Sequence, residues 1–210
     1  MRRSTWIVLG LSLLLNLPAA IAAEPAQAGS GGAPSYFEEF FKPGHFEAAL
    51  TGGAFFSPFP PCGNRPTINY SFTSLQLGYM LGNVQGNGWY RGNFELAGEA
   101  FGSGIFEGPG DFIAGGTLWI RYNFVPRHSP GLVPFVQAGA GMVTTDIDHH
   151  IVGQPFNFNL DAGFGVRYFL ARDWTLNLEY RYQHISNADM GENNLGINAC
   201  GPFLGISHFF

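Results

Sequence analysis

The run WTLNLEYRYQHISNA, residues 174–188, decides how this chain folds. Apolar and polar side chains alternate along most of it, and a period of two is the pattern of a β-strand. One face would carry Leu176, Leu178, Tyr180, Tyr182, His184 and Ser186. The other face would carry Thr175, Asn177, Glu179, Arg181 and Gln183. A water-soluble sheet buries its apolar face, whereas an outer-membrane barrel turns that face to lipid.

The rest of the chain favours the barrel. Strand-like runs separated by Gly, Pro and Asn clusters are predicted at residues 45–56, 68–81, 89–101, 111–124, 132–145, 156–170, 174–186 and 197–210. The breaks between them alternate between tight turns and longer loops, as in barrels that cross the outer membrane. Strands of about 9–11 residues suffice to cross it when tilted. We therefore expect an eight-stranded antiparallel up-and-down transmembrane β-barrel.

Composition agrees with this fold class. The chain has 30 glycines and 16% aromatic residues, which suit a small barrel with aromatic girdles. Charged residues make up 12% of the chain, about half of the roughly 25% usual in soluble domains. The alternative is a soluble, lipocalin-like eight-stranded barrel. That barrel needs an apolar interior, which the polar face of residues 174–186 contradicts.

Three segments are expected along the chain. Residues 1–23 have the charged start, apolar stretch and small-residue cleavage site of a secretory signal peptide. Residues 24–44 would form a periplasmic N-terminal linker, in which 35–41 is a short turn that packs near the base of the barrel. The barrel itself would span residues 45–210. The formal net charge of −5 argues against nucleic acid as a partner.

His184 and Ser186 are the first candidates for chemistry. Residues i and i+2 of a strand lie on the same face, with Cα atoms roughly 7 Å apart. At that separation the serine Oγ can reach an imidazole nitrogen, the pairing that activates a serine nucleophile. A His-x-Ser pair on a strand is weak evidence by itself, and its apolar surroundings strengthen it.

The sequence HISNA at 184–188, NLGIN at 194–198 and the aromatic last strand ending at Phe210 resemble the lipid A 3-O-deacylase family of PagL-type outer-membrane enzymes. The resemblance is specific over about the last forty residues. It implies an eight-stranded barrel that hydrolyses the 3-O-linked acyl ester of lipid A by serine chemistry, with no metal or other cofactor. It assigns Ser186 as nucleophile, His184 as general base and Asn187 as the oxyanion-stabilising side chain.

One position departs from the family pattern. The glutamate that orients the histidine in the family falls at Asn198. Hairpin geometry supports that match, because a turn centred on Gly191 pairs residue 184 with residue 198. An asparagine can accept a hydrogen bond from histidine but carries no charge to stabilise the imidazolium. Glu192, nearer the tip of the loop, is the alternative acid.

The resemblance also implies a place and a partner. The two termini would lie in the periplasm, which puts His184 and Ser186 at the outer leaflet of the Gram-negative outer membrane, facing lipid A of lipopolysaccharide. The alternative function is a catalytically inactive structural barrel.

In an exported chain Cys62 and Cys200 could form a disulfide, or remain as two thiols. The acyl-chain selectivity and the existence of a homodimer stay open.

Overall fold

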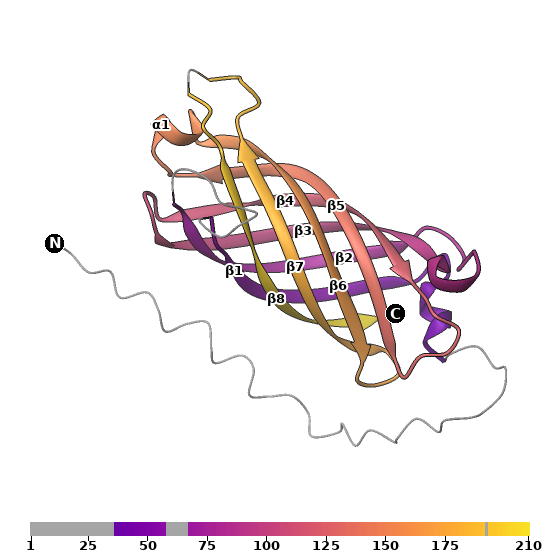
Figure 1. Cartoon of the computed structure of the whole chain (residues 1–210). Coiled ribbons are helices and arrows are strands. Elements are labelled where there is room, and N and C mark those ends of the chain that lie inside the picture. The colour runs from indigo at the N-terminus through magenta and orange to yellow at the C-terminus, as the bar shows by residue number, and fades with distance from the viewer. Residues whose placement is uncertain (1–35, 58–66, 192) are drawn as a thin grey trace.

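The computed structural model describes residues 36–57, 67–191 and 193–210. Eight antiparallel strands form one closed barrel, in which every strand pairs with its neighbours in sequence and β8 closes onto β1 (Figure 1). The strands are β1 (Phe46–Phe55), β2 (Asn69–Met80), β3 (Gly92–Glu107), β4 (Phe112–Phe124), β5 (Leu132–Thr145), β6 (Phe156–Phe169), β7 (Trp174–Ser186) and β8 (Ile197–Phe209). The predicted fold class is confirmed.

The predicted boundaries are wrong mainly at β3. This strand runs on to Glu107, although residues 102–110 were expected to form a loop. The alternation of buried and exposed residues continues through Ser103, and Gly104 pairs with Phe112 of β4, so the glycines do not end the strand. At its other end, Gly88–Tyr90 forms a 3-10 turn, η2, and β3 therefore begins at Gly92 instead of residue 89.

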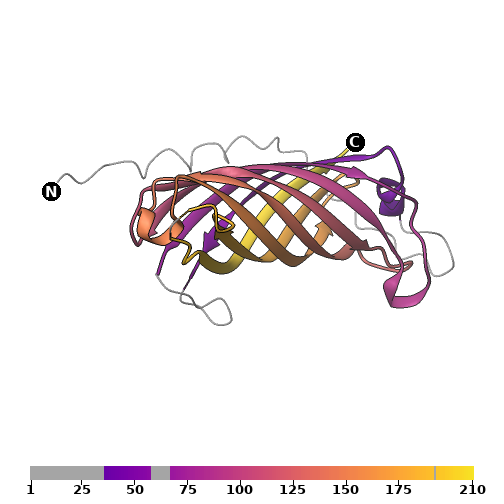
Figure 2. The same ribbon diagram turned by 90° about the horizontal axis from the view of Figure 1, so that it is seen from above.

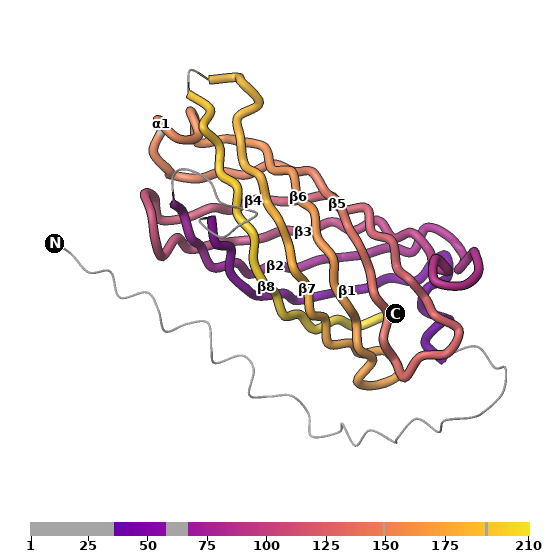
Figure 3. The backbone as a smooth tube through the Cα atoms, viewed as in Figure 1, coloured from indigo at the N-terminus to yellow at the C-terminus, as the bar shows by residue number. Residues whose placement is uncertain are grey.

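The two ends of the barrel differ. The end that holds the C-terminus, here called the terminal end, also holds the 3-10 helix η1 (Tyr36–Phe41) (Figures 1 and 2). The opposite end, here called the loop end, carries the one-turn helix α1 (His149–Val152) and the segment between β7 and β8, which extends past the rim (Figure 3). Among the described residues, no helix is long and apolar enough to cross a membrane.

The terminal end is closed by η1. Phe37 and Phe41 are fully buried and pack with Phe169 and Phe209 in an apolar cluster. Glu38 of the same helix accepts a hydrogen bond from Arg91 at 2.5 Å. The segment 35–41 was expected to pack near the base of the barrel, and residues 36–41 do so. The predicted signal peptide and the first part of the predicted linker lie outside the described residues.

The outer wall of the barrel is apolar. Exposed side chains along the middle of the strands are leucine and phenylalanine, each 54–66% exposed: Leu75, Leu77, Leu118, Leu160, Phe164, Leu178 and Leu204. Exposed aromatic residues flank this zone towards the terminal end (Tyr79, Phe94, Trp174, Phe210) and towards the loop end (Phe106, Phe112, Phe156). An apolar band between aromatic girdles is the surface of a barrel embedded in lipid.

The interior is polar and filled. Three buried arginines pair with four buried glutamates: Arg121, Arg167 and Arg181 with Glu47, Glu95, Glu99 and Glu179. Both glutamate contacts of Arg181 measure 2.8 Å. Apolar clusters cover this charged layer at the loop end and at the terminal end. The polar face of residues 174–186 therefore points into a packed lumen, as predicted for a small membrane barrel.

The charged layer gives a testable stability contribution. Arg167 contacts both Glu47 and Glu95, and all three side chains are at most 2% exposed. Arg167→Leu leaves two buried carboxylates short of a partner, which costs about 3–5 kcal/mol. We expect a lower thermal midpoint in detergent micelles. Arg172→Leu is the control, because its ion pair with Glu39 is exposed and its loss should leave the midpoint unchanged. Equal midpoints for the two variants would contradict the expectation.

Candidate active site

The site is built by the pairing of β7 with β8. The register places His184 directly opposite Asn198, as the hairpin geometry predicted. His184 Nδ1 and Asn198 Oδ1 are 2.5 Å apart. Because the amide oxygen can only accept, this contact assigns the proton to Nδ1 and leaves Nε2 with a free lone pair. Both side chains belong to the outward, lipid-facing wall and are half-buried.

Ser186 follows two residues later on the same face, at the last position of β7, and is also half-buried. On its other side β7 pairs with β6, where Leu160 opposes His184 and Phe158 opposes Ser186. Ile185, between the two polar residues, points inward and is 1% exposed within the apolar cluster of the loop end. Ile185 therefore packs β7 against the interior, while His184 and Ser186 face outwards.

Gly196 forms part of the wall beside the pair and was missed by the sequence reasoning. Its φ of +66° lies in the left-handed region, and its N–H donates to the carbonyl of Ile151 at 3.2 Å. A Cβ at this position would lie 3.3 Å from His184 Cε1 and 3.7 Å from Ser186 Cβ. A residue without a side chain therefore lets the backbone approach both groups closely.

Asn187 lies on the other face of the chain from Ser186 and is fully buried. Its Nδ2 donates to the carbonyl of Asn193 at 2.7 Å and to that of Val152 at 3.2 Å. Its backbone N–H donates to Asn194 Oδ1 at 3.1 Å. In this arrangement Asn187 braces the segment between β7 and β8 against α1. The oxyanion role that the resemblance implies stays a prediction.

At the loop end, the side chain of Asp146 also links two loops. Asp146 Oδ1 accepts hydrogen bonds from the backbone N–H groups of Asp111 at 2.9 Å and Phe112 at 3.0 Å. Desolvation opposes its charge, but the backbone hydrogen bonds outweigh it and hold the pKa of Asp146 below its usual value. The carboxylate is therefore ionised at neutral pH and joins the segment after β5 to the turn before β4.

Two predicted site residues, Glu192 and Cys62, lie outside the described residues. Cys200 is buried. Its backbone N–H and carbonyl pair with Phe56, where β1 leads into the segment that contains Cys62. The Cys62–Cys200 disulfide stays a prediction, and the position of Cys200 beside Phe56 supports it.

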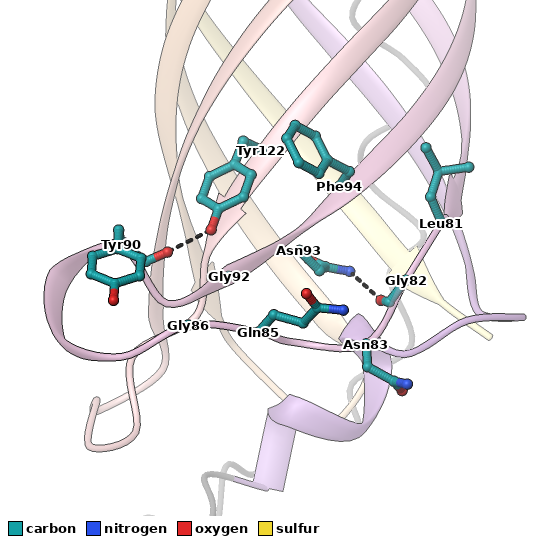
Figure 4. A pocket seen from close by; sticks show the side chains of 10 residues that line it. All are labelled: Leu81, Gly82, Asn83, Gln85, Gly86, Tyr90, Gly92, Asn93, Phe94 and Tyr122. Atoms are coloured by element: carbon teal, nitrogen blue, oxygen red, sulfur yellow. Dashed lines mark hydrogen bonds between the residues drawn. The ribbon is translucent and has the colours of Figure 1, made fainter.

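A pocket of about 490 Å³ lies elsewhere, at the turn between β2 and β3 near the terminal end (Figure 4). Leu81, Phe94 and amide side chains line it, and the Tyr122 hydroxyl donates to the carbonyl of Tyr90 at 2.5 Å. Its lining contains no serine, histidine or carboxylate. The candidate active site is therefore on the wall of the barrel and not in this pocket.

The bracing contacts of Asn187 can be tested by stability. Asn187→Ala removes two buried hydrogen bonds, each worth about 1 kcal/mol. We expect a lower thermal midpoint and faster proteolysis between residues 187 and 196. Asn83→Ala, at an exposed position in the turn at the opposite end, is the matched control and should change neither. An unchanged midpoint together with lost activity would mean that Asn187 serves the oxyanion alone.

Comparisons with known proteins bear on this geometry. Residues 64–207 match the family described as lipid A 3-O-deacylase (PagL). A comparison with curated protein sequences finds no match. The barrel is similar to the crystal structure of Neisserial surface protein A, with 15% identity over 80% of this chain and 97% of that one and a TM-score of 0.56. It is also similar to the outer membrane enzyme PagL, with 18% identity over 76% of this chain and 97% of that one and a TM-score of 0.53. The N-terminal barrel of Pseudomonas aeruginosa OprF matches with 17% identity over 79% of this chain and 97% of that one and a TM-score of 0.51.

At these identities the structural likeness establishes the fold alone. The family match is different in kind, because it spans more than half of the chain, from the residues before β2 to Ser207 in β8. Together with the lipid-exposed belt, it places the barrel in the outer membrane of Gram-negative bacteria. The chain belongs to the lipid A 3-O-deacylase (PagL) family.

Proposed function

We propose that this protein is an esterase that removes the 3-O-linked acyl chain of lipid A at the outer leaflet. Ser186 is the nucleophile, His184 the general base and Asn198 the residue that orients the histidine. The observation that carries the proposal is the 2.5 Å contact between His184 Nδ1 and Asn198 Oδ1, made on the lipid-facing wall two residues before a serine.

The proposed reaction has two steps. His184 Nε2 takes the proton of the Ser186 hydroxyl as Oγ attacks the ester carbonyl. The acyl–oxygen bond then breaks, and the imidazolium returns the proton to the departing 3-oxygen of lipid A as a hydroxyl. Water, deprotonated by the same nitrogen, hydrolyses the acyl-enzyme to a free fatty acid and restores Ser186. The net reaction consumes one water for each ester cleaved.

The depth of the site suits this substrate. His184 and Ser186 stand at the loop end of β7, beside the aromatic residues Phe156 and Phe158 of β6. A polar pair is costly inside hydrocarbon but is tolerated at the headgroup boundary, where the ester bonds of a lipid lie. The acyl chain would extend along the exposed leucines of the wall, so the membrane itself keeps the reacting groups away from bulk water.

The oxyanion donor requires a change in the contacts of one side chain. The resemblance assigns it to Asn187, whose Nδ2 is bonded to the carbonyls of Asn193 and Val152. To donate to an oxyanion beside Ser186, this amide would have to release one of these carbonyls when the substrate binds.

The mass of lipid A tests the function directly. Cells that express the protein should show lipid A lacking one hydroxyacyl chain. Ser186→Ala and His184→Ala should each lower kcat by about 10³-fold or more, and the double variant should be little worse, because residues that act as one unit are strongly non-additive. Ser71→Ala, an exposed serine on β2, is the control and should stay active. Unchanged lipid A in the wild-type strain would favour the inactive structural barrel.

The role of Asn198 is tested by a second set of variants. Asn198→Ala should leave the barrel folded and slow turnover; loss of an orienting group costs up to about 10⁴-fold in a serine protease, and less is expected here because asparagine carries no charge. Asn198→Glu should hold or raise kcat, since a carboxylate stabilises the imidazolium. Glu192→Gln should be neutral. A damaged Glu192→Gln enzyme beside an unaffected Asn198→Ala enzyme would transfer the role to Glu192.

A further inference from the structure

Tyr182 lies on the outward face of β7, two residues before His184. The register places Tyr182 opposite Cys200, and Asn198 lies two residues from Cys200 along β8, towards the loop end. Its hydroxyl donates to Asn198 Oδ1 at 3.0 Å. The same oxygen therefore accepts two hydrogen bonds, one from His184 Nδ1 and one from Tyr182.

We propose that Tyr182 is a positioning residue that keeps the Asn198 amide turned with its oxygen towards His184. The inference rests on the proposed function, because it concerns the protonation state of the general base. It also explains how a neutral asparagine can serve at this position.

The need for such a residue follows from the chemistry of an amide. The oxygen and the NH₂ group of asparagine have nearly the same shape but opposite hydrogen-bonding character. If the Asn198 amide turned over, Nδ2 would donate to His184 Nδ1 and the ring proton would move to Nε2. The nitrogen that should accept the Ser186 proton would then be blocked. A wrong tautomer of this kind is what disables a serine protease whose orienting aspartate becomes asparagine.

The hydroxyl of Tyr182 disfavours the turned amide. With Oδ1 in its observed place, the phenol donates its proton to it. With Nδ2 in that place, the phenol could only accept, and its own proton would lack a partner on a wall that faces lipid. An unmade hydrogen bond in such surroundings costs free energy. A glutamate at position 198 would need no such help, since both of its oxygens only accept.

Tyr180 provides a matched control within the same strand. It lies on the same face, two residues earlier, and the register places it opposite Pro202. Among the described residues, its hydroxyl donates to Cys200 Sγ at 3.1 Å and not to Asn198. Tyr180→Phe therefore removes a lipid-facing phenol hydroxyl without removing a hydrogen bond to the Asn198 amide.

The experiment compares Tyr182→Phe with Tyr180→Phe, each in the natural Asn198 protein and in Asn198→Glu, with lipid A in detergent micelles as substrate. In the Asn198 protein we expect Tyr182→Phe to lower kcat about tenfold, the effect of one lost buried hydrogen-bond partner, with KM unchanged. In Asn198→Glu the same change should alter kcat less than about twofold. Tyr180→Phe should match its parent in both backgrounds.

A second measurement does not depend on activity. Nitrogen-15 chemical shifts of labelled histidine at position 184 report which ring nitrogen is protonated. Tyr182→Phe should move the signal from the Nδ1–H towards the Nε2–H form. This result would support the role of Tyr182 even if the protein cleaves no lipid A. Absence of cleavage would refute only the proposed esterase. An unchanged tautomer, or an equal loss of kcat in both backgrounds, would overturn the role of Tyr182.

Discussion

Hydrocarbon offers no hydrogen-bond partners to a peptide backbone, and this constraint governs the whole molecule. A sheet can satisfy all its backbone groups in lipid only when it closes on itself, as β8 does onto β1. Closure also makes the register obligatory, because a slip of one residue would turn the leucine-rich face inwards and the charged face to lipid. The pairing of His184 with Asn198 is a consequence of that register. The site thus inherits its geometry from the same hydrogen bonds that make the barrel stable in a membrane.

The filled lumen favours a candidate site on the outer wall. Three arginines and four glutamates occupy the middle of the barrel, and apolar clusters cover both sides of this layer. In the described part of the chain, paired charged side chains occupy this layer, whereas the outer wall carries the apolar belt that faces lipid. Ile185 and Ile197 pack β7 and β8 against the inner cluster, so the side chains of the candidate site stand on a packed wall. For the proposed esterase, the bilayer would supply the water-poor surroundings that a soluble esterase obtains from a deep pocket.

In the proposed mechanism, asparagine at position 198 performs only one of the two tasks that a carboxylate performs together. A carboxylate orients the histidine and also stabilises its positive charge, whereas an amide can only orient, and only in one of its two rotations. The contacts around Asn198 address the first task, through the register with His184 and the hydroxyl of Tyr182. The second task has no charged group in the described part of this site. In the proposed mechanism, orientation of the histidine and stabilisation of its charge are therefore separable contributions.

The sequence alone determined the features that depend on local spacing: the number of strands, the face to which each side chain belongs, and the opposition of residues 184 and 198 across a turn centred on Gly191. Alternation and turn length are properties of neighbouring residues, so they can be read without coordinates. Only the tertiary structure decided the extension of β3 to Glu107, the inward contacts of Asn187 and the approach of Gly196 to the site. These depend on partners far away in the chain or on the path of a loop, and side-chain periodicity carries no information about either.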